Sequence, residues 1–457
     1  MQHKTILTLL LCLLLFGIQA QSNKPNIVIY LADDLGYLDI ASSGAEVVQT
    51  PVLQKLSNEG MTFNNAFVAS PSCAPSRAAL LTGLMPAVNG AETNHSYPKQ
   101  DVPYLIDQIK KSGYKVLAFG KVAHYGGAKY CGFDFHHDEQ VNLYNNIKGY
   151  LDTTEIDQPI CLFVGDRRPH VRWTEEMIYD PADVDLPANF VDTRATREHR
   201  AMYYTDITDL DREMGHVLHY FEQKYGENTL TMFTSDHGAQ WPFGKWNLYD
   251  TGIRTPLIVK WPGQVPEMSR TDAMVSWIDI LPTVLDVIDS KLPTILDGQS
   301  FKDVLLNGQK EFREEVYTTH TGDGKFNIYP MRSIRTGRYK LIVNTTSDAY
   351  HTNHSDLLRN PRAGEYWNSW YDAAKTDPHA ASIIDKYYIR PKRELYDLLN
   401  DPEEQENLID DPAYQEIIAG LQTKLTSWMK KQDDDGLPHR EPYPISGPIP
   451  DRKMIGE

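Results

Sequence analysis

Short, nearly continuous apolar runs recur along the first 260 residues, and each has the length of a strand buried on both faces. They cover residues 25–31, 113–120, 158–164, 228–234 and 257–260. Because parallel strands covered by helices have unbroken hydrophobic sequences, this pattern predicts an α/β sheet at the centre of the fold.

Apolar residues at helical spacing lie between these runs and predict helices that cover the sheet. We expect helices at residues 51–60, 104–111, 195–224 and 275–288. The last helix should be interrupted near Pro282, because proline lacks the N–H that a helix interior needs. Residues 61–67 favour one more strand, which leads into the segment around Cys73.

The pattern changes near residue 313, where the apolar runs become shorter. Short strands are predicted at 316–319, 331–334, 339–343 and 394–398, and a closing helix at 411–432. A turn at 336–338 joins two of the strands as a hairpin, whereas residues 344–393 are polar and poorly periodic. We therefore divide the chain into a first domain, 21–312, and a smaller C-terminal subdomain, 313–457, built on an antiparallel sheet.

Residues 1–20 have the features of a signal peptide. Lys4 gives a cationic start, an apolar core runs from residue 6 to 18, and Ala20 ends a plausible cleavage site. The apolar core is too short for a membrane span, so we expect none. The expected location is the periplasm or the exterior of the cell.

The net charge of the chain limits the kinds of molecule that it can bind. The formal net charge of the 457-residue chain is −17, which argues against nucleic acid as a partner. An anion site in such a chain must be locally basic. After the signal peptide only three cysteines remain, Cys73, Cys131 and Cys161, too few for a disulfide scaffold. A Cys131–Cys161 bridge and two buried thiols both remain open.

The sequence around Cys73 predicts the N-terminus of a helix. Pro75 suits a first turn, and residues 78–81 are strong helix formers. Free N–H groups and the helix dipole favour an anion there, and Arg77 follows one turn later, close enough to fix an oxyanion or a metal-bound oxygen. The simpler alternative is that Cys73 is only a small buried residue.

Polar side chains follow the carboxyl ends of four predicted strands, the edge at which sites form in open α/β sheets. These residues are Asp33, Asp34, Lys121, His124, His170, Asp236 and His237. Each has an ordinary alternative, such as a helix-capping aspartate, a solvated lysine or a solvated loop. Their common position predicts instead that they converge on Cys73.

The three aspartates are hard oxygen ligands and predict a divalent cation site, with Ca²⁺ preferred to Mg²⁺. Asp33, Asp34 and Asp236 would bind the ion together with Cys73, and His237 would complete the shell or hydrogen-bond to it. A buried strand that ends in two carboxylates is costly without such a cation.

The string from Cys73 to Arg77, followed by Leu81-Thr82-Gly83, resembles the signature of the type I sulfatase family. Asp33-Asp34, Gly120-Lys121 with His124, Asp236-His237-Gly238 and Lys245 extend the resemblance over most of the chain. It implies an alkaline-phosphatase-like α/β sandwich, with a large mixed sheet flanked by helices and a smaller C-terminal antiparallel sheet subdomain. The first domain would then be the sulfatase catalytic domain.

The resemblance also implies the chemistry. A sulfatase-maturing or formylglycine-generating enzyme oxidises the family's cysteine, here Cys73, to formylglycine, whose hydrated form attacks sulfur. Lys121 and Lys245 would bind the sulfate oxygens, His124 would orient the nucleophile, and His170 would protonate the leaving group.

Two branches of the family look similar to different parts of the chain. Residues 120–124 and 235–238 resemble iduronate-2-sulfatase, whereas residues 329–333 and 393–397 resemble heparan N-sulfatase. Both branches act on anionic polysaccharides, and related bacterial enzymes act on algal ulvan. The resemblance thus implies a sulfated polysaccharide or its oligosaccharides as substrate. The basic cluster Arg167, Arg168 and Arg172 would suit a uronate or a second sulfate.

Two alternatives remain open. A phosphodiesterase or phosphonate monoester hydrolase of the same superfamily can carry the same nucleophile motif. A non-catalytic glycan-binding protein could keep the fold, although the intact set of candidate ligands argues against it.

Overall fold

The computed structural model describes residues 24–456 of the chain. The predicted signal peptide lies outside this range. Among the described residues, none of the helices combines the length and the apolar character that crossing a membrane requires.

An eight-stranded mixed sheet forms the centre of the molecule, as the apolar runs predict. In spatial order its strands are β5 (Phe135–His137), β4 (Lys115–Gly120), β6 (Ile160–Gly165), β1 (Asn26–Ala32), β7 (Thr229–Ser235), β8 (Leu257–Lys260), β2 (Met61–Phe63) and β9 (Ser269–Thr271). The strands from β5 to β7 are parallel, and β8 runs antiparallel to both of its neighbours. The α/β sandwich that the sequence predicts is therefore confirmed.

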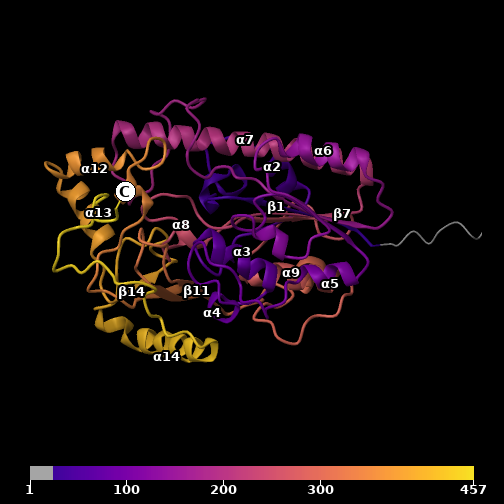
Figure 1. Cartoon of the computed structure of the whole chain (residues 1–457). Helices are drawn as coiled ribbons and strands as arrows, with labels where there is room; N and C mark the ends of the chain where they lie inside the picture. The colour runs from indigo at the N-terminus through magenta and orange to yellow at the C-terminus, as the bar shows by residue number, and fades with distance from the viewer. Residues whose placement is uncertain (1–23, 457) are drawn as a thin grey trace, which may run out of the picture.

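Helices cover both faces of this sheet (Figure 1). One layer holds α2 (Pro51–Asn58), α6 (Leu143–Thr153) and the long α7 (Arg194–Tyr225). The opposite layer holds α3 (Cys73–Thr82), α5 (Ile106–Lys111) and α9 (Ile280–Val287). Shorter helices are α4 (Pro86–Asn89), α8 (Asp250–Ile253) and α10 (Lys302–Asn307).

The register of the parallel strands aligns their carboxyl ends. Ala32 of β1 lies opposite Ser235 of β7, so the residues that follow, Asp33 and Asp236, emerge side by side. On the other side of β1, Leu31 lies opposite Gly165 of β6, which in turn lies opposite Gly120 of β4. A Cβ at Gly165 would lie 2.2 Å from the backbone of Lys121, so only glycine permits this close approach.

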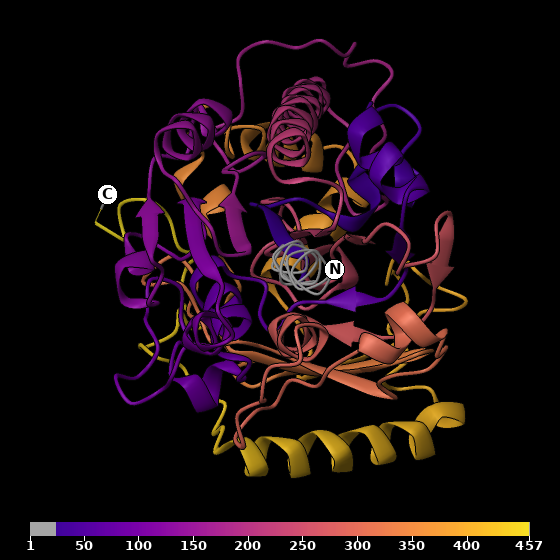
Figure 2. The same cartoon turned by 90° about the vertical axis from the view of Figure 1, so that its right-hand side faces the viewer.

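The C-terminal part is a four-stranded antiparallel sheet with a helix, as predicted. Its strands are β11 (Glu315–His320), β12 (Met331–Thr336), β13 (Tyr339–Asn344) and β14 (Arg393–Asp397), in that order. The helix α14 (Gln415–Gln432) lies along one side of this sheet (Figure 2). Ile334, Leu341 and Leu395 form a small core with Leu421 and Leu425 of the helix.

Three local expectations differ from the structure. Residues 61–67 form two strands in different sheets, β2 and β3 (Ala66–Phe67), and β3 pairs with β10 (Val275–Ser276). The helix expected at 275–288 begins only at Ile280, so Pro282 lies in its first turn, where proline fits, and interrupts nothing. The poorly periodic stretch 344–393 contains α11 (His354–Leu358), α12 (Trp367–Ala374) and α13 (Pro378–Tyr388).

One hydrophobic core runs through both parts of the chain. It joins strand residues such as Ile29 and Met232 to Met331, Ile342 and Trp367 of the C-terminal part. The domain boundary between residues 312 and 313 stays a prediction, because the core does not divide there. Cys131 and Cys161 are buried free thiols, so the structure favours the second of the two alternatives for this pair.

Candidate active site

Cys73 begins helix α3 at the bottom of a cavity. Ser72 before it is extended, Cys73 is the first helical residue, and Pro75 lies in the first turn. The side chain is buried, with an exposed fraction of 1%, and points toward the carboxyl ends of β1 and β7. Cys73 thus lies at the N-terminus of a helix, as the sequence predicts.

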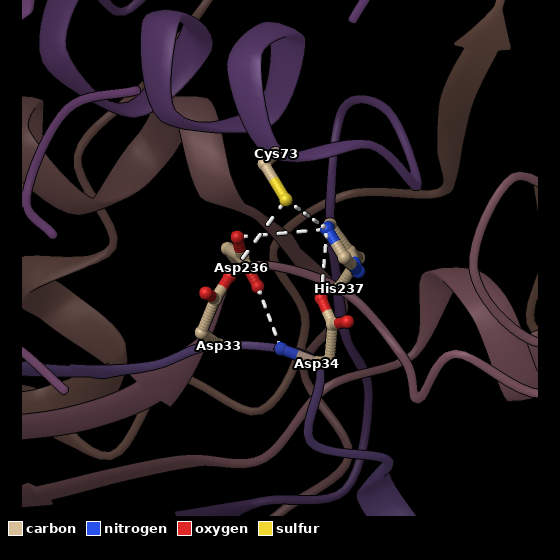
Figure 3. Close-up of side chains that lie close together, drawn as sticks. All are labelled: Asp33, Asp34, Cys73, Asp236 and His237. Atoms are coloured by element: carbon tan, nitrogen blue, oxygen red, sulfur yellow. Dashed lines mark hydrogen bonds and ion pairs between the residues drawn. The ribbon is translucent and has the colours of Figure 1, made fainter. Parts of the chain in front are cut away.

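Three carboxylates and a histidine gather beneath the thiol (Figure 3). The sulfur of Cys73 lies 3.7 Å from Oδ1 of Asp33 and 3.3 Å from Nε2 of His237. The backbone N–H of Asp34 donates a hydrogen bond of 3.0 Å to Oδ1 of Asp236. One ligand atom from each of these five residues lies within 4.8 Å of the others, and all five residues are buried.

Two lysines reach the same point from opposite sides. Lys121 Nζ lies 2.5 Å from Oδ2 of Asp33 and 3.5 Å from the Cys73 sulfur. Lys245 Nζ lies 2.9 Å from Oδ1 of Asp34 and 3.3 Å from the same sulfur. Both ammonium groups are therefore placed to contact an anion bound at residue 73.

Arg77 contacts the carboxylates of the candidate cation cluster, which agrees with its predicted place beside a metal-bound oxygen. Its Nε lies 2.9 Å from Asp236 and its Nη2 lies 3.2 Å from Asp33, and Nη1 donates to the carbonyl of Lys121. The guanidinium is buried behind the carboxylates and does not line the main cavity. In this structure Arg77 therefore holds Asp33, Asp236 and Lys121 together, and its catalytic role stays a prediction.

The two candidate histidines flank the thiol. The His124 ring lies beside the Cys73 sulfur, and its Nε2 is 2.8 Å from Nδ1 of His95. His170 Nδ1 hydrogen-bonds the Val171 carbonyl at 2.6 Å, while Nε2 lies 3.9 Å from Oδ2 of Asp34. Both rings line the cavity, so both are within reach of a bound molecule.

The concentrated charge shifts the pKa values of the site. Burial alone raises the pKa of Cys73, but Lys121, Lys245 and His237 outweigh it and hold this pKa well below its ordinary value. Burial likewise raises the pKa of Asp33, and the Lys121 ammonium overcomes it and lowers this pKa. The environment at residue 73 therefore favours a negative charge.

The cavity above Cys73 has a volume of about 620 Å³ and a largely basic lining. It contains residues that sequence reasoning did not select: His95, Trp246, Asp323, His354 and Arg362. Asp323 is fully buried, accepts hydrogen bonds from Asn94 and Trp246, and lies 3.4 Å from Nε2 of His95. Of the predicted arginine cluster, Arg167 and Arg172 line the cavity, whereas Arg168 does not and pairs with Asp166 at 2.7 Å.

The donor set fits a hard divalent cation. Three buried carboxylates lie in one cluster with His237 and the Cys73 sulfur, each carboxylate next to a lysine or an arginine. Carboxylate oxygens are the ligands that Ca²⁺ and Mg²⁺ prefer. The residues that would hold the ion are Asp33, Asp34, Asp236, His237 and residue 73.

Sequence comparisons agree with the fold and the site. The family model described as "Sulfatase" matches residues 25–290, more than half of the chain, and that of the N-sulphoglucosamine sulphohydrolase C-terminal region matches residues 237–386. The fold and the site thus define an α/β enzyme with a buried cysteine above a cluster of residues that could hold a cation. The chain belongs to the sulfatase family, and its reaction is the hydrolysis of sulfate esters.

Two curated relatives cover nearly the whole chain. An ulvan-active sulfatase from Formosa agariphila is 31% identical over 91% of this chain and 82% of its own length. Human N-sulphoglucosamine sulphohydrolase is 30% identical over 92% of this chain and 93% of its own length. The resemblance to sulfatases of polysaccharides is therefore confirmed.

Solved structures share the fold at lower identity. A protein solved with its substrate D-glucosamine-2-N,6-O-disulfate has a TM-score of 0.69 at 18% identity, covering 92% of this chain and all of that chain. A phosphonate monoester hydrolase from Agrobacterium radiobacter has a TM-score of 0.70 at 18% identity, covering 90% of this chain and 96% of that chain. The fold alone does not separate these two chemistries.

Proposed function

We propose that this sulfatase removes sulfate groups from a sulfated polysaccharide or its oligosaccharides, of the ulvan or glycosaminoglycan type. The observation that carries the proposal is the arrangement of Cys73, which lies beneath a basic cavity and between two lysines and three carboxylates. The cavity has the size of a sugar-binding site, and the two curated relatives support a glycan substrate.

Cys73 is proposed to act after conversion to formylglycine, whose hydrated form supplies the attacking hydroxyl. A bound divalent cation, Ca²⁺ in preference to Mg²⁺, would polarise the sulfate group. The carboxylates of Asp33, Asp34 and Asp236, with His237, would hold that cation.

The surrounding residues then take distinct roles in the proposal. Lys121 and Lys245 bind the sulfate oxygens and offset the charge that develops on them. His124 orients the nucleophile, and His170 donates a proton to the leaving oxygen or nitrogen. In the net reaction one water is consumed, and the free hydroxyl or amine and inorganic sulfate are released.

The proposal extends to processing and location. The predicted signal peptide supports export to the periplasm or the cell exterior. The formylglycine requires a sulfatase-maturing enzyme as a partner during biosynthesis.

The test measures sulfate release by protein that is co-expressed with a maturing enzyme. Substrates are oligosaccharides of ulvan, carrageenan and heparan sulfate, and a phosphate diester and a phosphonate monoester serve as controls. We expect release from at least one glycan. Turnover of the phosphorus esters alone would favour the alternative function, a hydrolase of the phosphonate type.

Two substitutions test the assignment of the nucleophile and the cation site. Cys73→Ala and Asp236→Ala should each abolish turnover, because they remove the attacking group and one cation ligand. Their circular dichroism spectra should match that of the wild type. Wild-type activity in Cys73→Ala would exclude the formylglycine mechanism.

A further inference from the structure

We propose that the active-site cavity contains a second anion subsite, formed by Arg167, Arg172 and Arg362. It would bind a carboxylate or a second sulfate of the same glycan while Lys121 and Lys245 hold the sulfate that is hydrolysed. This inference rests on the proposed function and deepens it, because it adds a second acidic group to the substrate.

The charged residues that line the cavity are mostly basic. Besides the lysines and histidines near Cys73, it contains these three arginines and a single carboxylate, that of Asp323. Asp323 is fully buried and already accepts hydrogen bonds from Asn94 and Trp246. In a chain with a net charge of −17, this wall is a local basic surface that favours a bound anion.

The arginines are available for a ligand. Within residues 24–456, Arg172 is exposed and has no carboxylate at ion-pair distance. In the same part of the chain, the Arg167 side chain donates one hydrogen bond, to the carbonyl of Val171 at 2.7 Å, and pairs with no carboxylate. Arg362 lies 3.5 Å from Glu175, whose side chain is 81% exposed, so solvent weakens that pair.

Arg168 provides the internal contrast. It stands beside Arg167 in the sequence, but its guanidinium is bound to the buried carboxylate of Asp166 at 2.7 Å and 2.9 Å. Arg168 uses its N–H groups to bind Asp166 and therefore has a structural role. The three arginines on the cavity wall still have N–H groups that can donate to a ligand.

The wall is held in position before any ligand binds. The N–H of Trp173 donates to the carbonyl of Arg362 at 3.0 Å, and Nη1 of Arg362 donates back to the carbonyl of Trp173 at 2.9 Å. Trp173 is fully buried and its ring lies 4.6 Å from that of Trp241. Two loops that are far apart in the sequence are thereby locked together, which lowers the entropy cost of binding.

The wall is also next to the reacting group. His170 lies between Arg167 and Arg172 in the loop and approaches Asp34 to within 3.9 Å. A guanidinium offers two parallel N–H groups that match a carboxylate or a sulfate. One ligand that spans the cavity can therefore place one anion at residue 73 and another at the arginines.

The test compares substrates with and without the second anion. Uronate-containing oligosaccharides of ulvan and heparan sulfate are paired with the same oligosaccharides after reduction of their carboxyl groups. Glucosamine-2-N,6-O-disulfate is paired with glucosamine N-sulfate, and 4-nitrophenyl sulfate has no second anion. The first pair tests whether the subsite binds a carboxylate, and the second pair tests whether it binds a second sulfate.

We expect KM to rise about tenfold or more when the second anion is absent in at least one pair, the loss of one or two charged hydrogen bonds. Arg172→Gln and Arg362→Gln should raise KM for the doubly anionic member of that pair far more than for its partner. Arg172→Lys keeps the positive charge but loses the two parallel N–H groups of the guanidinium. Its KM should lie between those of the wild type and Arg172→Gln.

Arg212→Gln is the matched control, because Arg212 is 64% exposed on α7 and does not line the cavity. It should leave KM unchanged for both members of each pair. If the wild type releases sulfate but neither pair differs in KM, or if Arg172→Gln and Arg362→Gln affect both members equally, the subsite is excluded. If no substrate releases sulfate, the proposed function fails and the subsite fails with it.

Discussion

At the scale of single residues, the site brings acids and bases together in a buried space. Asp33 and Asp34 each contact a lysine, and Asp236 contacts Arg77, so every carboxylate has a cationic neighbour. Such a cluster is tightly balanced, and losing any one member leaves a buried charge without its partner. The predictions at this scale therefore concern the cation and the residues that support the histidines.

Removal of the proposed cation should abolish activity. Treatment with a chelator would leave three buried carboxylates without the ion, and we expect sulfate release to stop and to return on adding Ca²⁺, less fully with Mg²⁺. Sulfate release and elemental analysis of the dialysed protein check this. The melting temperature should also rise with added Ca²⁺, because the ion binds the folded state. Full activity in metal-free protein would contradict the assignment.

His95 should support catalysis without contacting the sulfur. Its Nδ1 lies 2.8 Å from His124 Nε2 and its Nε2 lies 3.4 Å from Asp323, so it fixes the orientation of the His124 ring. We expect His95→Ala to lower kcat by about 10-fold to 100-fold, the usual effect of losing such a supporting partner. KM should change less. His219→Ala, at an exposed position of α7, is the control, and equal kcat values in the two variants would exclude this role.

Much of the site follows from the sequence, for a physical reason. Asp33, Lys121 and Asp236 directly follow apolar runs, and parallel strands in register must bring such residues to one edge. His354 and Arg362 could not be found in this way, because they lie in a stretch without periodicity. Their place in the cavity depends on how the C-terminal part packs on the first domain.

At the scale of elements, several helices depend on side chains from distant segments. Asp211 of α7 is one example, because its carboxylate accepts hydrogen bonds from the backbone N–H groups of Val52 and Leu53 at 2.9 Å and 2.8 Å. These groups lie in the first turn of α2, where no local cap is present. The long helix therefore caps the short one.

Replacing Asp211 tests this link through its pH dependence. Burial raises the pKa of Asp211 to about 6, above its value of about 3.9 in an unfolded chain. The folded state therefore binds the proton more tightly, and this contribution to stability is present at low pH and lost as pH rises through about 6. The stability advantage of the wild type over Asp211→Asn should be larger at pH 4.5 than at pH 7.5, by about 2 kcal/mol.

Urea unfolding of both proteins at the two pH values measures the difference. Asp209→Asn is the control, because it lies two residues away on the same helix and leaves the α2 cap intact. Parallel pH profiles for the wild type and Asp211→Asn would show that the carboxyl does not titrate in this range.

The predicted helices and strands agree with the structure where the apolar pattern is strong, and they differ from it where the local sequence is ambiguous. The long helix α7 has a clear helical period and the buried strands are continuous apolar runs, and the structure confirms both. In residues 61–67 the polar pair Asn64-Asn65 separates the apolar positions, and the chain changes sheet at this short break, which the prediction of one strand passed over. The helices α12 and α13 are rich in Trp and Tyr, which have only modest helix propensity, and packing in the core decides their structure.

At the scale of the whole molecule, the two sheets are joined by buried ion pairs. Asp250 of α8 lies 3.2 Å from Arg335 and 2.7 Å from Lys340, which come from the C-terminal sheet. Lys340 is fully buried and lies 2.7 Å from Glu404 as well. Together with the shared core, these contacts predict that the chain unfolds as one unit.

Asp250→Ala should destabilise the protein by about 3–5 kcal/mol, because it leaves a buried arginine and a buried lysine short of a partner. Unfolding in urea, followed by circular dichroism and by tryptophan fluorescence, should give coincident transitions for wild type and variant. Asp372→Ala, which removes an exposed pair with Lys375, should cost less than about 1 kcal/mol. Separate transitions for the two probes would show that the parts unfold independently.

The burial of Cys73 also has a consequence for when, relative to folding, the proposed modification could take place. The cavity admits a sugar, but a second protein cannot reach a side chain that is 1% exposed at its base. Under the proposed modification of Cys73, a maturing enzyme would therefore have to act while this segment is still extended, before α3 docks against the sheet. Modification and folding would then compete in time, and a molecule that folds first would keep its thiol. The fraction of active enzyme would be decided during synthesis.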